Sequence, residues 1–238
     1  MKIIAIITLL FLPLQILANL NKLTKSDWLF LQKYCRDFLS NNKENIEIYT
    51  NESGFYRVKI SSPANCKKDI ITIRINYWAE DSTKMLMAEN IHNHPNYFES
   101  KIIKGWYKHE LFNVSKIKNV NSHFISYSID NTDPFNKKII AQKSVYLHSK
   151  AIEKVSENDI INIDTNLIHR ITIFKPGPLS INVTFKNYGQ INHIYEVFFT
   201  KHSRPEENTN TRIKISNQKD RDYLINSMIT ILSNNIKN

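Results

Sequence analysis

Short segments rich in β-branched and aromatic residues fill the chain from residue 46 to residue 200, and they limit the folds open to it. They lie at residues 46–50, 55–60, 70–78, 97–106, 124–129, 144–147, 160–163, 168–174, 179–186 and 194–199. Many of them alternate between apolar and polar residues, which is typical of a strand with one buried face. Clusters of turn-forming residues separate them. The pattern predicts an all-β protein, either a sandwich or a barrel.

Helical periodicity marks the two ends of this β-rich region. In residues 24–40 the apolar residues recur at helical spacing, and Thr24 or Ser26 can cap the first turn. Residues 217–236 have one apolar face and predict a closing helix. We therefore divide the chain into a signal peptide at 1–18, a helix that packs on the barrel at 19–45, the barrel at 46–202, and a loop with a helix at 203–238.

Composition narrows the class of protein. Hydrophobic residues make up 42% of the 238 residues, which suits a globular core. The chain has four glycines and no glycine cluster, and this argues against nucleotide-binding folds. The net charge is +10, yet no run of five basic residues occurs. We interpret the charge as a solvated basic surface and expect no nucleic-acid partner, with contact to anionic polymers as the alternative.

Residues 1–18 have the features of a signal peptide. Lys2 is followed by an apolar stretch at 3–12, and Ala18 suits the position before a cut. The stretch is short for a spanning helix, which needs about 20 apolar residues. We expect a secreted or periplasmic protein without stable membrane insertion after cleavage; an uncleaved anchor is the alternative.

Export bears on the two cysteines of the chain, Cys35 and Cys66. In an oxidising compartment they can pair and tie the first helix to the early strands. A bond of this kind typically stabilises a fold by about 2–4 kcal/mol. We predict this disulfide, and two buried free thiols are the alternative.

A pair of histidines at i and i+2 is the strongest chemical signal. On an extended strand, His92 and His94 point to the same face, and Glu99 follows five residues later. Imidazole and carboxylate ligands suit Fe(II), Mn(II), Zn(II) or Ni(II) better than Mg(II) or Ca(II). A chance pair is the alternative, because the chain has eight histidines.

The stretch around these histidines resembles the first motif of the cupin superfamily. That motif has two alternate histidines, four residues, a glutamate, a short apolar strand and a glycine, and His92, His94, Glu99 and Gly105 match it in order. The letters HNHPNYFE are similar to the germin-type version. The spacing from glutamate to glycine is one residue shorter than usual. Residues 98–105 also resemble cysteine-dioxygenase-like cupins, which usually lack the carboxylate ligand.

Residues 158–169 are similar to the second cupin motif and end at His169. Asn158 and Asn166 stand where the family usually has glycine. Asparagine tolerates the left-handed conformation best after glycine, so both positions are compatible with the turns of the motif.

The resemblance implies a cupin-type double-stranded β-helix, which is a jelly-roll barrel, with flanking N- and C-terminal helices. It implies one divalent metal ion held by His92, His94, Glu99 and His169, with iron first and manganese, nickel or zinc as alternatives. It also makes a homodimer a reasonable expectation.

Four further residues are candidates for contact with a small-molecule substrate: Arg74, Tyr77, Tyr107 and His109. Arg74 suits a substrate carboxylate because its fork matches that group, although a surface salt bridge is the alternative. Arg170 follows His169 and should point away from the metal. The expected function is an exported metal-dependent oxidoreductase of dioxygenase type. The alternative is a non-catalytic secreted binding module whose basic surface contacts anionic polymers or a host partner.

Overall fold

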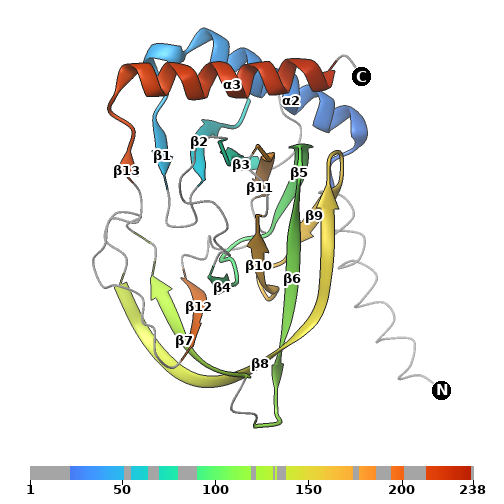
Figure 1. Cartoon of the computed structure of the whole chain (residues 1–238), viewed down its shortest axis with the longest axis vertical. Coiled ribbons are helices and arrows are strands. Elements are labelled where there is room, and N and C mark those ends of the chain that lie inside the picture. Colours follow the sequence, from blue (N-terminus) through green and yellow to red (C-terminus); the bar gives the residue numbers. More distant parts are fainter. Residues whose placement is uncertain are drawn as a thin grey trace, which may run out of the picture.

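The computed structural model describes residues 22–50, 55–63, 70–79, 90–118, 122–130, 132, 138–173, 177–185, 194–200 and 213–236. Two long helices lie across one end of two antiparallel sheets (Figure 1). The helices are α2 (Lys25–Asn41), the short 3-10 helix η1 (Lys43–Asn45) and α3 (Gln218–Ile236). The strands are β1 (Ile48–Thr50), β2 (Tyr56–Ser61), β3 (Ile70–Tyr77), β4 (Ile91–His92), β5 (Phe98–Lys104), β6 (Trp106–Ser115), β7 (His123–Asp130), β8 (Lys138–Ser156), β9 (Ile160–Ile163), β10 (Ile168–Thr172), β11 (Leu179–Phe185), β12 (Ile194–Thr200) and β13 (Ile213–Lys214). Within the described ranges, neither long helix has the hydropathy needed to cross a bilayer.

The order of the strands defines the fold. Sheet A has the order β13-β1-β2-β3-β11-β5-β9, and sheet B is a closed ring in the order β10-β4-β12-β7-β8-β6. Four strands of sheet A, β3-β11-β5-β9, face four strands of sheet B, β4-β10-β6-β8, and the chain passes back and forth between the two sets. This is the arrangement of a jelly roll, in which two four-stranded sheets enclose the core. The predicted all-β jelly-roll barrel with flanking helices is confirmed.

Helices α2 and α3 cover the outer face of sheet A. Helix α2 begins with a capping box, in which the Thr24 hydroxyl accepts from the backbone N–H of Asp27 and the Asp27 carboxylate accepts from the Thr24 N–H. The buried face of α2 packs with α3 and with strands β3 and β11 in one apolar cluster: Trp28, Leu31, Leu39, Ile73, Ile75, Ile181, Val183, Leu224 and Met228 are among its members. Burial of this face explains why the helices form, because their propensity alone is ordinary.

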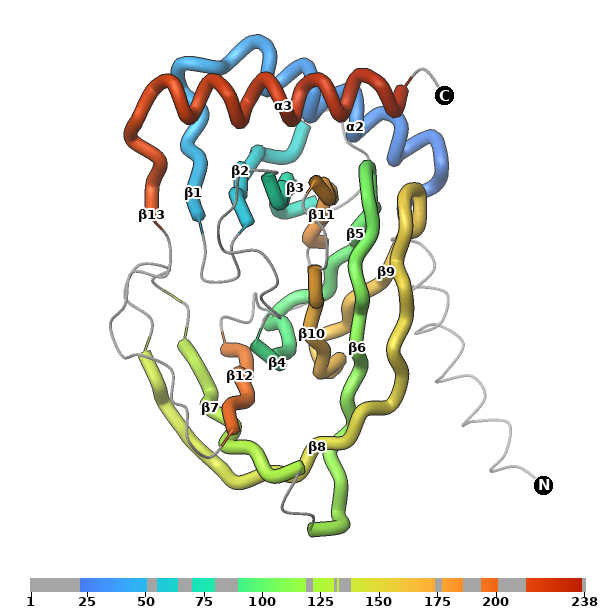
Figure 2. The backbone as a smooth tube through the Cα atoms, in the orientation of Figure 1, coloured from blue at the N-terminus to red at the C-terminus, as the bar shows by residue number. Residues whose placement is uncertain are grey.

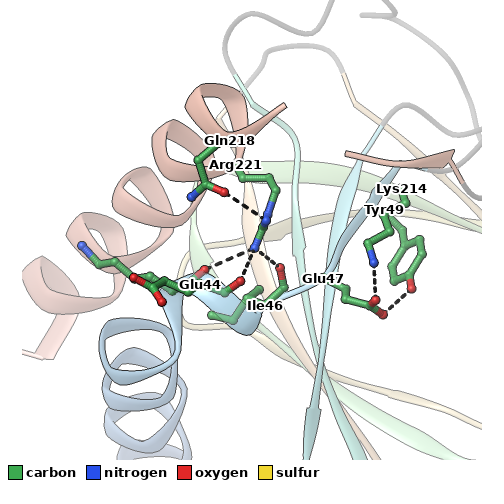
Figure 3. A network of polar contacts seen from close by, with 8 residues as sticks. Glu44, Ile46, Glu47, Tyr49, Lys214, Gln218 and Arg221 are labelled. Atoms are coloured by element: carbon green, nitrogen blue, oxygen red, sulfur yellow. Dashed lines mark hydrogen bonds and ion pairs between the residues drawn. The ribbon is translucent and has the colours of Figure 1, made fainter. Parts of the chain in front are cut away.

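Polar contacts fix the second helix to the chain that follows the first (Figure 3). The Arg221 guanidinium on α3 donates to the backbone carbonyls of Lys43, Glu44 and Ile46, at 3.3, 3.0 and 2.8 Å. Nearby, the Lys214 ammonium on β13 pairs with the Glu47 carboxylate. Strand β13 lies in the segment predicted as a loop and pairs with β1, so the C-terminal segment adds an edge to sheet A.

Sequence alternation separates the two faces of sheet A. On β3, Ile73, Ile75 and Tyr77 belong to the cluster under the helices. The residues between them, such as Arg74 and Asn76, therefore point to the inner face, toward sheet B. The same alternation on β11 turns Ser180, Asn182 and Thr184 inward, because Ile181 and Val183 belong to the helix-side cluster. The inner face is polar on these two strands.

Gly105 explains the largest difference from the predicted strands. The run expected as one strand at 97–106 is two strands, β5 and β6, in different sheets. Gly105 joins them with φ +80°, and a Cβ on it would lie 3.1 Å from the Cα of Pro178. Only glycine combines that conformation with so close a neighbour.

The stretch between the two motifs contains long antiparallel hairpins. Strand β8 has 19 residues; its first half pairs with β7 and its second half with β6. Both views show β8 curving along the lower end of the molecule, away from the helices, with β12 beside β7 (Figures 1 and 2). The ring has a core of its own, made of Ile91, Phe112, Val145, Leu147, Ile168 and Phe198.

Two predictions fall wholly or partly outside the described residues. The signal peptide at 1–18 lies outside them. Cys35 is fully buried on α2 and has no disulfide partner among the described residues, and burial raises the pKa of its thiol to about 12. Its predicted partner, Cys66, lies outside the described residues, so the disulfide stays a prediction.

Candidate metal centre

Three histidine side chains meet on the inner face of sheet B. His92 on β4 lies directly opposite His169 on β10, and opposite residues of an antiparallel pair share a face. His94 follows His92 by two residues and joins them. The structure brings the two alternate histidines together on one face, and His169 lies with them; the role of the three as metal ligands stays a prediction.

The three side chains of this cluster point their Nε2 atoms toward one another. The Nε2 atoms of His92 and His94 are 3.2 Å apart, and those of His94 and His169 are 3.0 Å apart. Imidazole nitrogen binds zinc-like metals at about 2.0–2.1 Å, so two nitrogens at right angles on one metal lie about 3 Å apart. The three residues therefore fit one transition-metal ion.

In His92 and His169, the ring nitrogen Nδ1 faces away from the cluster and contacts a partner that orients the ring. The Nδ1 atom of His92 lies 2.7 Å from the backbone oxygen of Asn90. A carbonyl only accepts, so this Nδ1 carries the proton and leaves Nε2 as a lone pair. The Nδ1 atom of His169 lies 2.7 Å from Nε2 of His109. Such partners behind the ligands fix the tautomer and the plane of a metal-binding histidine.

His109 was predicted to contact substrate, and the structure places it behind His169 instead. It is 3% exposed and lies on β6, where register puts it beside the β10 strand. Because its ring contacts a cluster member, the structure supports a positioning role. Its position two residues after Tyr107 on the same strand was the sequence signal that His109 faces the interior.

Burial disfavours the charged form of His94, His169 and His109. Burial, followed by the charge of neighbouring histidines, lowers the pKa of His169 well below its ordinary value. The pKa of His94 is also lowered well below its ordinary value, first by burial, then by the charges of His92 and Arg74. The pKa of His109 falls to about 4, mainly through burial. Neutral imidazoles offer lone pairs at neutral pH, as metal binding requires.

Glu99, the predicted carboxylate ligand, does not join the three histidines. Phe98, the residue before it, packs edge-on against the His94 ring at 4.7 Å between centroids. Alternation then turns Glu99 to the helix side of sheet A. There its oxygens accept from the Leu23 N–H at 3.2 Å and the Tyr97 hydroxyl at 3.1 Å. The short spacing between Glu99 and Gly105 was the one sequence sign of a changed register.

The other predicted substrate contacts divide between the two faces. Arg74 is on the inner face of sheet A, and its charge acts on His94. Tyr107 lies in the interior beside Trp78, with ring centroids 6.2 Å apart. Tyr77 packs in the cluster under the helices, away from the histidines. Arg170 points away from them as predicted, because its Nε donates to Glu110 at 2.7 Å on the opposite face.

The sequence interpretation missed Arg57. This residue on β2 faces the interior, and its Nε donates to Oδ1 of Asn76 at 3.0 Å. Its guanidinium carbon lies 4.8 Å from the centroid of the Phe55 ring. Like Arg74, it lowers the pKa of His94 through its charge. Alternation in the sequence puts Arg57 on the polar face of its strand. Only the pairing of β2 with β3 shows that this face points into the interior between the sheets.

Comparison with known proteins gives matches among solved structures. No protein-family model and no curated protein matches the chain. An RmlC-like cupin from Shewanella frigidimarina is 12% identical, with 61% of this chain and 88% of that chain covered and a TM-score of 0.33. Oxalate decarboxylase from Bacillus subtilis is 12% identical, with 68% and 33% covered and a TM-score of 0.37. A cupin-like protein from Thermotoga maritima is 8% identical, with 58% and 71% covered and a TM-score of 0.30.

The strand order by itself defines the jelly roll. Fold and cluster together define a jelly-roll protein with a candidate three-histidine metal centre between its sheets.

Proposed function

We propose that this chain is a metal-dependent cupin-type oxidoreductase that acts on a small molecule. The observation that supports the proposal is the convergence of three imidazole Nε2 atoms between the sheets. Three nitrogens leave further coordination positions open, and a bound transition metal would supply Lewis-acid and redox chemistry there. Iron is our first choice, with manganese, nickel or zinc as alternatives.

The position of Glu99 favours one branch of this proposal. Because no carboxylate of the described residues joins the histidines, the ligand set is closer to that of the cysteine-dioxygenase-like cupins that residues 98–105 resemble. We therefore infer dioxygenase-type chemistry in preference to carboxylate-ligated cupin chemistry.

The chain's own residues have distinct parts in this proposal. His109 holds the ring of His169 through its 2.7 Å contact. Phe55, Trp78 and Tyr107 form an apolar cluster with Ile102 and Val155, which excludes water from one side of the interior. Exclusion of water strengthens electrostatic interactions with a bound substrate.

Export remains part of the proposal. The signal-peptide features of residues 1–18 support a secreted or periplasmic protein without stable membrane insertion after cleavage. A homodimer stays a prediction.

A net charge of +10 supports the second candidate function, a non-catalytic module whose basic surface contacts anionic polymers.

Metal content tests the proposal. We expect about one equivalent of a transition metal in protein purified without chelators, by elemental analysis, because one three-nitrogen site holds one ion. The His92→Ala/His94→Ala double variant should lose it. His148→Ala is the matched control, because His148 is an exposed residue of β8 outside the cluster.

The control variant should keep the metal, and the bound metal then selects the assay. With iron, oxygen consumption should accompany turnover of the substrate. A correctly folded wild-type protein that takes up no iron, manganese, nickel or zinc would contradict the proposal and favour the binding module.

A further inference from the structure

The inner face of sheet A carries an ordered set of polar side chains opposite the histidines. Register places Arg74 on β3 beside Asn182 on β11, which lies beside Ser100 on β5. The neighbouring row contains Arg57, Asn76 and Ser180. Residues in register across a sheet share a face, so these groups point into the interior together.

Hydrogen bonds orient the amides of this face. The hydroxyls of Ser100 and Ser180 both donate to Oδ1 of Asn182, at 2.8 and 3.1 Å. The Asn182 oxygen is thus engaged, and its amino group is turned away from the two serines as a donor. In the next row, the Asn76 oxygen accepts from Nε of Arg57, which fixes the plane of the guanidinium. The face therefore presents donors.

Two buried hydroxyls nearby have no partner within the described ranges. They belong to Thr72 and Thr184, which lie opposite each other and are each 4% exposed. Thr184 lies beside Phe98, and Phe98 packs on His94. A buried hydroxyl without a hydrogen bond is costly, so such a pair indicates a place that a polar ligand or water completes.

We propose that the inner face of sheet A, between Arg57 and Arg74, binds the carboxylate of a small polar organic acid beside the three-histidine centre. The planar fork of a guanidinium matches a carboxylate, and the amide and hydroxyl neighbours suit a polar acid better than a fatty one. Phe98 lies in register beside Thr184 on this face and packs on His94, so an acid bound here lies near the histidines. The reaction of this acid rests on the proposed function, but its binding does not.

Binding of matched acids and amides tests the inference. The probes are lactate and succinate, with lactamide and succinamide as their neutral counterparts, measured by calorimetry on the whole purified protein at 0.15 M salt. We expect the acids to bind and the amides not to bind. Arg57→Gln and Arg74→Gln should each weaken acid binding by about tenfold or more, because each removes a charge-assisted hydrogen bond.

Arg36→Gln is the matched control. It also removes one positive charge, but Arg36 lies on α2 and pairs with Asp37, away from the interior. This variant should bind the acids as the wild type does. Equal weakening in Arg36→Gln, or equal binding of acids and amides, would overturn the inference, because general charge attraction would then explain the result.

Arg57→Lys and Arg74→Lys keep the charge and remove the fork, and each should still weaken binding several-fold. They keep the test valid where a glutamine variant fails to fold. Binding by the lysine variants equal to that of the wild type would overturn the carboxylate geometry.

Metal analysis of each variant separates this inference from the proposed function. The arginine variants should retain the metal, and the His92→Ala/His94→Ala variant should lose it while keeping arginine-dependent acid binding. Acid binding in a protein that takes up no metal would overturn the proposed function alone. Metal uptake without arginine-dependent acid binding would overturn this inference alone.

Discussion

The two faces of sheet A differ in composition although the same strands form them. On β3 and β11 the outer residues are isoleucine, valine, leucine, tyrosine and phenylalanine packed under the helices, and the inner ones are arginine, asparagine, serine and threonine. The outer face contributes the apolar burial that holds the fold together. The inner face buries less apolar surface and instead carries hydrogen-bond donors next to the histidines. Stability and chemistry are thus divided between alternate residues of the same strands.

Truncation of the outer face should have the largest effect on stability. Ile75→Ala removes a fully buried side chain and should lower the free energy of unfolding by about 2–5 kcal/mol, because it leaves a cavity. Metal content should not change. Denaturant unfolding measures the loss, and Ile140→Ala is the control, since Ile140 is 52% exposed. Equal effects of the two substitutions would contradict the division of the faces.

Low pH should destabilise the metal-free protein, because it protonates the buried His109 on the inner face of sheet B. The pKa of His109 is about 4 in the folded state, against 6.5 ordinarily, mainly because of burial. Between these values the unfolded state binds more protons, so stability is full above about pH 6.5 and falls as the pH drops toward 4. The loss from His109 is up to about 3 kcal/mol. Unfolding of chelator-treated protein across this range measures it, and a flat profile would contradict it.

Removal of the contact behind His169 should weaken metal binding without abolishing it. His109→Phe keeps the ring volume but deletes the 2.7 Å contact, and loss of such a partner typically costs 10–100-fold, roughly, in metal affinity. Competition with a coloured chelator measures the affinity. His123→Phe is the control on β7. Unchanged affinity in His109→Phe would mean that the backbone pairing of β10 orients His169 without the His109 contact.

Glu99 tests the comparison of the two faces of sheet A, because it belongs to the outer face. Glu99→Gln should keep the metal and lower the free energy of unfolding by roughly 1–2 kcal/mol, since a charged acceptor of the Leu23 N–H is lost. Elemental analysis and denaturant unfolding report the two quantities separately. Loss of the metal would restore Glu99 as a ligand and contradict its placement here.

The smallest effect is expected on the far face of sheet B. Arg170→Gln breaks the pair with Glu110, in which the arginine side chain is 36% exposed. A pair this exposed contributes about 1 kcal/mol or less. Thermal unfolding should shift slightly, while metal content and acid binding should stay as in the wild type. A loss of metal would mean that the two faces of β10 are coupled.

Local features of the chain could be predicted from the sequence. Alternation identified most strands, helical periodicity identified α2 and α3, and the two motifs identified His92, His94 and His169. Asn158 has φ 71°, as expected for an asparagine in a glycine position, whereas Asn166 does not adopt a positive φ. These features depend on backbone preferences and side-chain period, which act within a few residues.

Only the tertiary structure decided which side chains meet. The face of Glu99, the contact between His109 and His169, and the place of Arg57 all depend on how strands far apart in sequence pair. A one-residue change in register turns every side chain of a strand to the other face, and local sequence hardly encodes it. The sequence thus determined most of the strands and the three histidines of the cluster, while the pairing of β2, β3, β5 and β11 determined which residues surround them.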